Sequence, residues 1–251
     1  MTCKICGNTK GNSTFSVREM MIGLREEFNY FMCKECECLQ IDSLPENIDS
    51  YYPENYYSYK NVDNKTSYIK SIFQKYRDTY AIEKSNPIGW IFNKIKPATD
   101  FIQLLSVCNI NKESNILDVG SGHGTRLLPL INAGYQITGI DPYNQEKIKI
   151  GTLEIFKKEI FDIQEKWDLI MFNHSFEHMP NPHKVFKKIN ELLKSDGKCL
   201  IRIPVIPSYA WKKYKTNWVQ IDAPRHFFIH SIKSMDHLAK EHGLKIKQVI
   251  Y

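Results

Sequence analysis

The chain has 251 residues, of which 42% are hydrophobic and 25% are charged, and its formal net charge is +6. This length fits one large domain, or one domain with a small module, and the hydrophobic content allows a sizeable core. No apolar run is long enough to cross a bilayer, and the amino-terminal sequence MTCKICGNTK has no apolar signal region. We therefore expect a cytoplasmic protein with reduced cysteines rather than a membrane or secreted protein.

Four of the seven cysteines form two Cys-x-x-Cys pairs, Cys3 with Cys6 and Cys33 with Cys36. Each pair is short enough to place two thiolates on one ion, so the two pairs predict a tetrahedral structural zinc site. The metal would replace the hydrophobic core that a module of roughly fifty residues cannot build. A redox pair and incidental thiols are the alternatives, and Cys38 is a competing ligand because it follows Cys36 by two residues.

The expected zinc-binding module, residues 1–50, is acidic. It holds five Lys or Arg residues against eight Asp or Glu residues, which gives a formal charge of −3 without the metal. An acidic module is a poor clamp for phosphates, and this argues against nucleic acid as a partner. The positive excess lies in the rest of the chain, where it fits either an anionic small substrate or a solvated basic surface.

An aromatic stretch, YYPENYYSY at Tyr51–Tyr59, follows the module. We interpret it as a linker whose tyrosines either pack against the main domain or cover a binding site. Helical spacing follows at Thr66–Tyr80 and Ile88–Cys108, with breaks at Pro87 and Pro97. These segments predict helices that precede the first strand of the main domain.

The stretch ILDVGSGHGTRLLPLINAGYQITGIDP, Ile116–Pro142, predicts one unit of strand, glycine turn, helix and strand. An apolar run ends at Val119, and the glycines that follow form a turn that lets another molecule approach the backbone. Gly134 ends the helix, and Asp141 stands at the carboxyl end of the second strand. Ligands of an open parallel sheet bind outside the carboxyl ends of the strands, where an acid suits a ribose diol.

The segment DVGSGHG, Asp118–Gly124, resembles the first motif of the class I S-adenosylmethionine (SAM)-dependent methyltransferases. It differs from the dinucleotide pattern GxGxxG, whose third glycine falls one residue later. The resemblance extends from about Phe101 to Ile250 and implies an α/β fold, a Rossmann-like sheet with helices on both faces. It also implies that the glycines pass close to the methionine and ribose parts of SAM, and that Asp141 binds the ribose hydroxyls. The implied cofactor-binding residues are Asp118, Gly120, Ser121, Gly122, Gly124, Asp141, Pro142, Glu159, Ile160, Asn173 and His174.

Beyond this unit we expect an irregular segment and then a third strand at Leu153–Lys157. Family members commonly place adenine contacts just after this strand, which here indicates Glu159 and Ile160. The turn at residues 151–152 is the alternative. A continuous apolar run at Trp167–Phe172 predicts the next strand, buried on both faces.

The segment NHSFEHMPNP, Asn173–Pro182, resembles the motif of the same family that passes beneath the SAM methyl group. His174, Glu177 and His178 are therefore expected near the reaction centre. Some relatives bind a divalent metal through a similar group, and structural hydrogen bonding is the alternative for Glu177 and His178. His174, on the loop itself, is the stronger candidate for a chemical role.

An amphipathic helix at Val185–Lys194 and a strand at Cys199–Val205 precede an insertion, Ile206–His230. Its DAPRHFFIH sequence resembles a motif in methyltransferases of bacterial capsule and lipopolysaccharide gene clusters, where the insertion covers the acceptor pocket. The implied acceptor-side residues are Asp222, Arg225 and His226. Trp211 and Trp218 either stack on a sugar or nucleotide or pack within the insertion.

The end of the chain predicts a helix at Ser231–His242, a cap at Gly243 and a strand at Leu244–Ile250. A class I sheet normally has one more antiparallel strand after this one. Three explanations remain: the chain is truncated, a partner supplies an edge, which includes a homo-oligomer, or the sheet ends short. The expected domains are a zinc-binding module at 1–50, an aromatic linker with leading helices at 51–110, and a methyltransferase domain at 111–251.

The resemblance implies methyl transfer from SAM to a hydroxyl, or to a phosphate- or phosphoramidate-type oxygen, of a sugar- or nucleotide-linked precursor of a bacterial surface polysaccharide. An alcohol must lose its proton, and a histidine with a pKa near neutrality can accept it, so His226 or His174 is the candidate base. Arg225 is the candidate for holding an anionic part of the acceptor. Two alternatives are a zinc-ribbon ribosomal RNA base methyltransferase and a non-catalytic protein that binds SAM or docks a partner.

Overall fold

The computed structural model describes residues 1–52, 67–144 and 147–251, which divide into two compact units. The glycine-loop unit is the described part of Tyr57–Asn173 together with Glu191–Ile201. The cysteine unit is the described part of Met1–Tyr56 together with His174–Asn190 and Arg202–Tyr251. His174–Asn190 and Arg202–Tyr251 thus group with the amino-terminal residues, so the cysteine unit is larger than the module expected at residues 1–50. Most of the aromatic stretch Tyr51–Tyr59 lies outside the described residues.

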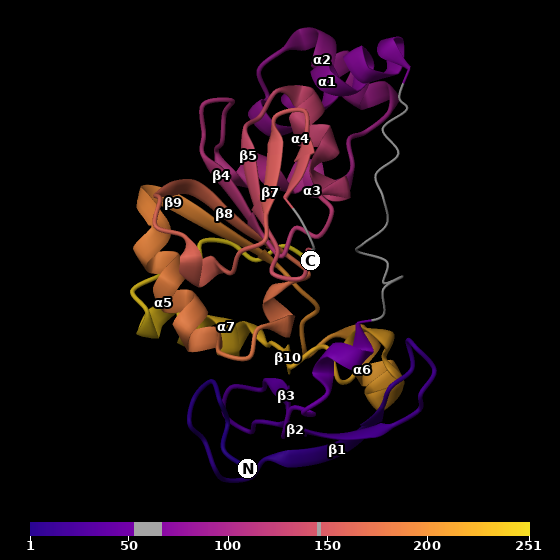
Figure 1. The fold of residues 1–251 in the computed structure, drawn as a ribbon, viewed down its shortest axis with the longest axis vertical. Coiled ribbons are helices and arrows are strands. Elements are labelled where there is room, and N and C mark those ends of the chain that lie inside the picture. The colour runs from indigo at the N-terminus through magenta and orange to yellow at the C-terminus, as the bar shows by residue number, and fades with distance from the viewer. Residues whose placement is uncertain (53–66, 145–146) are drawn as a thin grey trace. The chain divides into compact units, whose positions relative to one another are not determined.

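A six-stranded sheet flanked by helices forms the centre of the glycine-loop unit, in the order β6-β7-β5-β4-β8-β9 (Figure 1). Its strands are β4 (Ile116–Val119), β5 (Ile137–Ile140), β6 (Ile148–Ile150), β7 (Leu153–Phe156), β8 (Trp167–Asn173) and β9 (Leu193–Arg202). β4 pairs in parallel with both β5 and β8, and β5 pairs in parallel with β7. The chain therefore moves outward from β4 to β7 and returns to β8, and the strand order reverses between β4 and β8. Ligands of such sheets bind at this switch point.

Apolar runs account for the central strands, because every residue of β4 and all but one of β8 are buried. The strands predicted before the glycines that follow Val119, at Leu153–Lys157 and at Trp167–Phe172 are confirmed as β4, β7 and β8. The segment after Asp141 is expected to be irregular, but its residues Ile148–Ile150 form β6, which pairs antiparallel with β7. Lys147 and Lys149 lie 3.0 and 3.6 Å from Glu154 of β7, and such cross-strand charge pairs favour the pairing.

The helices of the glycine-loop unit follow the predicted breaks. They are α1 (Tyr68–Glu83), α2 (Pro87–Ile95), α3 (Asp100–Leu104) and α4 (Leu128–Ala133). Pro87 is the first residue of α2, whose N-cap Asn86 accepts a hydrogen bond from the N–H of Gly89. Gly134 ends α4 with a φ of 93°, a left-handed conformation that favours glycine.

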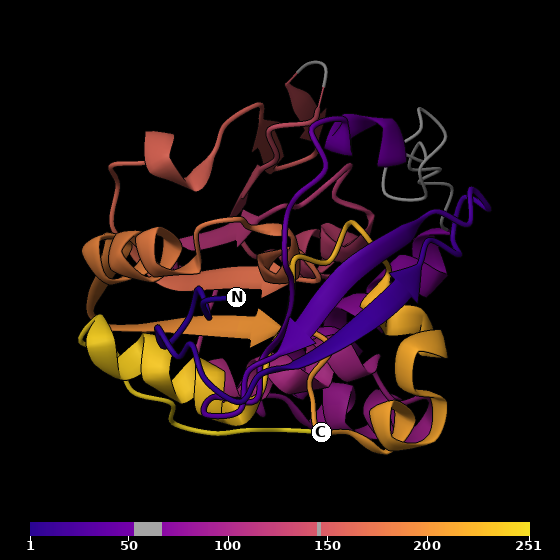
Figure 2. The same ribbon diagram turned by 90° about the horizontal axis from the view of Figure 1, so that it is seen from below.

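A second, antiparallel sheet forms the cysteine unit, in the order β1-β2-β3-β10. Its strands are β1 (Ser13–Arg18), β2 (Glu27–Met32), β3 (Leu39–Ile41) and β10 (Phe228–Ile229). Figure 2 shows β1 and β2 as two long strands lying side by side. β10 comes from the far end of the chain and pairs with β3, Phe228 opposite Gln40 and Ile229 opposite Leu39. This pairing fixes the segment that carries Arg225 and His226.

Three helices complete the cysteine unit or lead out of it: α5 (Pro182–Leu192), α6 (Tyr209–Tyr214) and α7 (Ile232–Glu241). The predicted strand at Cys199–Val205 instead begins directly after α5, as β9. Gly197 lies within β9, where a Cβ would meet the Trp167 carbonyl oxygen at 2.8 Å, so this glycine permits a close backbone approach instead of ending the preceding element.

The predicted strand at Leu244–Ile250 is wrong. Its alternating pattern is real, but no strand among residues 1–52, 67–144 and 147–251 pairs with it. A strand needs a neighbour for its backbone N–H and C=O groups, and a hydrophobic pattern alone does not supply one. Within the same described ranges, no helix combines the length and apolar character needed to span a bilayer.

Candidate functional site

A glycine loop follows β4 and turns the chain sharply at the switch point of the sheet. The N–H groups of Gly120 and Ser121 both donate to the Ile140 carbonyl of β5, at 2.8 and 3.2 Å. Three glycines of the loop have positive φ angles: Gly120 (73°), Gly122 (54°) and Gly124 (74°). A Cβ on Gly124 would lie 2.7 Å from side-chain atoms of β7. The loop path therefore requires glycine.

Asp141 ties the end of β5 to this loop. Its carboxylate accepts hydrogen bonds from the N–H of Gly122 at 2.8 Å and from the N–H of Tyr143 at 3.0 Å. Burial raises the pKa of Asp141, while these two N–H donors act in the opposite direction. Asn144 adds a hydrogen bond to the Gly122 carbonyl at 3.0 Å. The acid predicted at the tip of β5 thus lies against the glycine loop, next to Pro142.

Asp118 and Asn173 meet across β4 and β8. The Asn173 side-chain N–H donates to Asp118 Oδ1 at 3.0 Å. Burial raises the pKa of Asp118 to about 7, although the hydrogen bond from Asn173 acts in the opposite direction. A carboxyl group of this kind changes its charge near neutral pH, and perturbed groups are concentrated at functional sites.

Three buried polar atoms around the loop have no hydrogen-bond partner among the residues that the structure describes. They are Ser121 Oγ, Asn144 Oδ1 and Asn173 Oδ1. A buried polar atom without a partner costs about 1–3 kcal/mol. A ligand with hydroxyl or amino donors would stabilise these atoms, so the site fits a polar nucleoside better than an apolar ligand.

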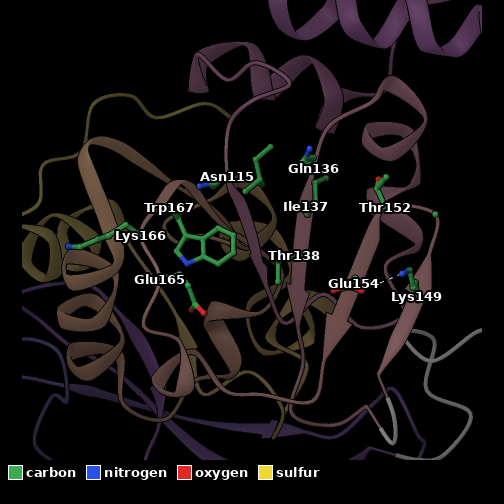
Figure 3. A pocket seen from close by; sticks show the side chains of 12 residues that line it. Asn115, Gln136, Ile137, Thr138, Lys149, Thr152, Glu154, Glu165, Lys166 and Trp167 are labelled. Carbon is green, nitrogen blue, oxygen red and sulfur yellow. Dashed lines mark ion pairs between the residues drawn. The ribbon is translucent and has the colours of Figure 1, made fainter.

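Glu159 and Ile160, the predicted adenine contacts, lie on the turn that follows β7. Ile160 is buried, and the Glu159 N–H donates to Asp162 at 2.9 Å. Their contact with adenine stays a prediction. The alternative, the turn at residues 151–152, precedes β7 and lines a hollow of about 570 Å³ with Trp167 and the first residues of β4 and β5 (Figure 3). That hollow lies at the amino ends of the parallel strands, opposite the glycine loop.

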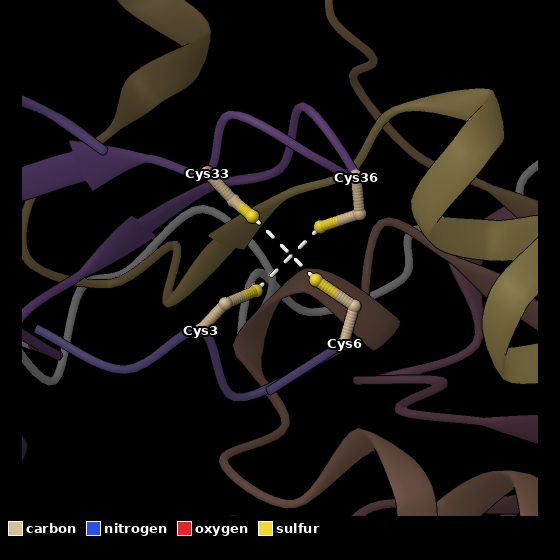
Figure 4. A group of neighbouring side chains, drawn as sticks. All are labelled: Cys3, Cys6, Cys33 and Cys36. Carbon is tan, nitrogen blue, oxygen red and sulfur yellow. Dashed lines mark hydrogen bonds between the residues drawn. The ribbon is translucent and has the colours of Figure 1, made fainter. Parts of the chain in front are cut away.

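In the cysteine unit, the sulfur atoms of Cys3, Cys6, Cys33 and Cys36 converge on one point (Figure 4). Two pairs of sulfur atoms lie 3.5 Å apart, and all four lie within 4.8 Å of one another. A tetrahedral site with Zn–S bonds of about 2.3 Å requires sulfur atoms about 3.8 Å apart. Cys38, the competing ligand, lies outside the group, and its Sγ lies 3.6 Å from the Leu39 carbonyl oxygen.

The two cysteine turns have the same local geometry. In each, the first cysteine donates its N–H to the carbonyl five residues later, at 2.9 Å, and accepts from the N–H four residues later, at 3.0 Å. The residue after the second cysteine is left-handed in both, Gly7 with a φ of 73° and Glu37 with a φ of 59°. The Gln40 side chain donates to Cys3 Sγ at 3.1 Å. Hydrogen bonds to sulfur are typical of thiolates that ligate a metal.

A second group in the cysteine unit joins Glu177, His178 and His226. His178 Nδ1 lies 2.8 Å from the Arg225 carbonyl oxygen, and His226 Nδ1 lies 2.8 Å from the Gln220 carbonyl oxygen. A carbonyl oxygen only accepts, so both Nδ1 atoms carry protons. In a neutral imidazole each Nε2 then has a free lone pair, and His226 Nε2 lies 3.9 Å from a Glu177 carboxylate oxygen.

The electrostatics of this group follow from its burial. Burial lowers the pKa of His178 and of His226 to about 4, against the opposing carboxylate of Asp222. Glu177 is fully buried, and neither of its carboxylate oxygens has a hydrogen-bond partner among the described residues. The alternative role proposed for Glu177 and His178 is structural hydrogen bonding. Among the described residues it applies to His178 but not to the Glu177 carboxylate. A proton accepted by His226 Nε2 would be stabilised by Glu177 and by Asp222, whose Oδ2 lies 3.8 Å away.

Arg225 departs from its predicted role. Its side chain is fully buried, its Nε donates to Asp222 at 3.0 Å, and one terminal nitrogen donates to the Tyr51 carbonyl at 3.0 Å. Glu19 lies 3.9 Å from the guanidinium and also accepts three backbone N–H groups. In this geometry Arg225 positions the His226 segment rather than contacting an acceptor. Glu19 was not predicted, because nothing in the sequence relates residues so far apart.

The remaining predicted residues lie at the border of the histidine group or away from it. His174 has a left-handed φ of 54°, and its Nδ1 lies 3.4 Å from a Glu177 oxygen. Its side chain is 33% exposed, which leaves it more accessible than His226 at 7%. Trp211 is buried and packs edge-on against Phe15, with ring centroids 5.4 Å apart, and Trp218 is half-buried. Trp211 is therefore a packing residue.

Comparison with known proteins gives related enzymes. The chain is 26% identical over 144 residues to the C-methyltransferase NovU of Streptomyces niveus, covering 53% of this chain and 33% of that protein. It is 29% identical over 115 residues to the ubiquinone biosynthesis O-methyltransferase of Glaesserella parasuis, covering 37% of this chain and 49% of that one. The solved structure of YcgJ from Bacillus subtilis shares 14% identity, with a TM-score of 0.46 over 55% of this chain and 65% of that one.

The chain thus spans about a third to a half of the length of these curated relatives. The sequence model of a family described as "Methyltransferase domain" matches residues 90–249. This match contains every strand of the six-stranded sheet, the glycine loop, Asp141 and Asn173. Because it covers more than half of the sequence, the chain belongs to this methyltransferase-domain family.

Proposed function

We propose that the protein is a SAM-dependent methyltransferase that methylates a hydroxyl, or a phosphate- or phosphoramidate-type oxygen, of a sugar- or nucleotide-linked precursor of a bacterial surface polysaccharide. The observation that carries the proposal is the glycine loop, where Asp118, Asp141 and Asn173 meet at the carboxyl ends of three neighbouring strands. Family membership supports the reaction type. The acceptor class rests on the resemblance of the DAPRHFFIH segment.

SAM supplies an electrophilic methyl group on a sulfonium ion. In the proposal Asp141 binds the ribose hydroxyls, as an acid at the tip of this strand does in dinucleotide-binding sheets. Ser121 Oγ and Asn173 Oδ1 are buried, have no hydrogen-bond partner within the described part of the chain, and would accept donors of the ligand. Asp118 holds Asn173 in place through their hydrogen bond. The glycines let the ligand approach the backbone.

The acid–base residues of the proposal lie in the cysteine unit. His226 is the base: its Nε2 accepts the proton of the acceptor hydroxyl while the acceptor oxygen bonds the methyl carbon and the carbon–sulfur bond breaks. Burial lowers the pKa of His226 to about 4, below the near-neutral value expected for the base, so the imidazole is neutral at pH 7 but binds a proton weakly without nearby carboxylates. Glu177 and Asp222 stabilise the resulting imidazolium. Positioning of the two reactants supplies much of the remaining rate.

Methylation of carbon is the second candidate, because one relative is a C-methyltransferase. The same neutral His226 could remove a proton from a carbon next to a carbonyl group. The oxygen and carbon reactions give products that differ in the position of the label.

The decisive experiment uses labelled SAM with a panel of nucleotide-linked sugars and phosphoramidates, followed by mass analysis of the product. We expect transfer of one labelled methyl group to oxygen. A label on carbon would favour the second candidate. If calorimetry on folded protein detects no binding of SAM or of its demethylated product, the whole proposal is wrong.

The first prediction concerns Asp118. Its pKa rises on folding from 3.8 to about 7, so between these pH values the folded protein binds a proton that the unfolded chain has lost. Stability therefore falls as the pH rises through this range, by up to about 4 kcal/mol. We expect Asp118→Asn to raise the free energy of unfolding by about 1–3 kcal/mol at about pH 8, with the gain disappearing towards pH 4, and to weaken SAM binding at least about tenfold.

Urea unfolding at both pH values and calorimetry with SAM measure these two effects. Asp168→Asn is the matched control, because Asp168 is half-exposed on β8, at the end of that strand away from the glycine loop. It should leave SAM binding unchanged. A stability gain for Asp118→Asn that does not depend on pH would contradict the assigned pKa.

The second prediction concerns His226. His226→Asn keeps a side-chain N–H for the Gln220 carbonyl but removes the base, so kcat should fall by about 10²–10⁴-fold while the Kd for SAM is retained. For the wild type, kcat should stay level from neutral pH down to about pH 5 and fall below that, because the base works in its neutral form. Steady-state kinetics over pH test both statements. If His174→Asn lowers kcat more than His226→Asn, His174 is the base.

We further propose that Cys3, Cys6, Cys33 and Cys36 hold a structural zinc ion. The convergence of the four sulfur atoms, their spacing and the matching turns support this. Zinc would fix the loop that joins β2 to β3, and β3 pairs with β10 beside His226. The ion would therefore hold the histidine group as well as the amino-terminal turns.

The third prediction is that removal of zinc by a chelator under reducing conditions abolishes turnover but leaves SAM binding to the glycine-loop unit. Metal analysis should give one zinc ion released for the four cysteines, and Cys36→Ser should reproduce the loss of turnover. Parallel loss of SAM binding, or full activity in zinc-free protein, would show that the ion does not have this role.

A further inference from the structure

A cluster of imidazole and carboxylate groups lies on the surface of the cysteine unit, apart from the four cysteines. His183 is the second residue of α5, Glu241 is the last residue of α7, and His242 follows it. One ligand atom from each lies within 4.8 Å of the others. His183 Nδ1 is 3.1 Å from His242 Nε2 and 3.6 Å from a Glu241 carboxylate oxygen.

The Ile5 carbonyl, which is not part of this cluster, determines which ring nitrogen of His183 carries the proton. His183 Nε2 lies 2.8 Å from the backbone carbonyl oxygen of Ile5, which only accepts, so Nε2 carries the proton. In the neutral imidazole the lone pair on Nδ1 then points to His242 and Glu241. Histidines that ligate metals characteristically donate their other N–H to a carbonyl or a carboxylate.

The distances from His183 Nδ1 to the other two ligand atoms also suit a metal ion. Bonds of about 2.0 Å in a tetrahedral site place neighbouring ligand atoms about 3.3 Å apart. The two distances from His183 Nδ1 bracket this value. His237, one turn before Glu241 on α7, lies 3.2 Å from the same carboxylate oxygen and orients it.

We propose that His183, Glu241 and His242 form a second divalent-metal site, selective for zinc-like ions, with one open coordination position. Two imidazole nitrogens and one carboxylate oxygen suit Zn²⁺ and Co²⁺ better than the harder Mg²⁺ and Ca²⁺. Ile5 lies between Cys3 and Cys6, so an ion here would join α5 and the end of α7 to the first cysteine turn. The site does not depend on the proposed methyl transfer.

The test is metal binding by the full chain with its cysteines already zinc-loaded. Equilibrium dialysis against micromolar Zn²⁺, followed by elemental analysis, should find one further ion per chain. His242→Ala and Glu241→Gln should each weaken it at least about tenfold and leave the cysteine-bound ion in place. Asp236→Asn, which removes a partly exposed acid from the same helix, is the matched control and should retain both ions.

Titration with Co²⁺ separates the two sites by spectrum. Thiolate ligands give intense charge-transfer bands, whereas the second site should add only the weak visible bands of nitrogen and oxygen ligands. Circular dichroism of each variant checks the fold. The proposal is overturned if no second ion binds at micromolar concentration, if it persists in His242→Ala, or if His226→Asn removes it instead.

Discussion

The pairing of β10 with β3 is the interaction on which the cysteine unit depends. Two hydrogen bonds reinforce it: the Ile41 N–H donates to the Phe227 carbonyl at 3.0 Å, and the Tyr30 hydroxyl donates to the His226 carbonyl at 2.9 Å. These contacts attach a segment near residue 226 to strands near residue 40. The cysteine turns fix those strands, so the proposed zinc ion and the histidine group belong to one cooperative structure.

Both candidate sites keep ionisable groups where water is excluded. Asp118 is buried at the glycine loop with one hydrogen bond from Asn173, and Glu177 is buried among histidines with none in the described residues. Such groups lower stability, and their presence is expected where a ligand or a transferred proton compensates for the cost. Arg225 is also buried, but its carboxylate and carbonyl partners satisfy it, and it therefore acts as a structural charge.

The parts of the fold that the sequence predicted are those decided by local chemistry. The glycines after Val119, the cap at Gly134 and the apolar run of β8 act within a few residues, and the strands and the loop lie where expected. The turn chemistry of the two Cys-x-x-Cys pairs is equally local. The resemblance of the glycine loop to a known family then supplied the ligand class.

The parts that could not be predicted depend on long-range contacts. Arg225 suggested an anion site until its partners, Glu19 and the Tyr51 carbonyl, emerged from the other end of the chain. The orientation of His226 depends on the Gln220 carbonyl, and the burial of Glu177 depends on packing that no periodicity reveals. At Leu244–Ile250 the alternating pattern predicted a strand, but the described residues contain no neighbouring strand to pair with it.

The interleaving of distant segments in the cysteine unit also determines how the gene can be shortened. A fragment lacking residues 1–52 would lose β3 and leave the edge of β10 unpaired, and exposed strand edges promote aggregation. The same deletion would strip Glu19 and the Tyr51 carbonyl from a guanidinium that remains shielded from water. The amino-terminal residues 1–52 therefore cannot be removed alone, because the segments that carry β10 and Arg225 depend on them.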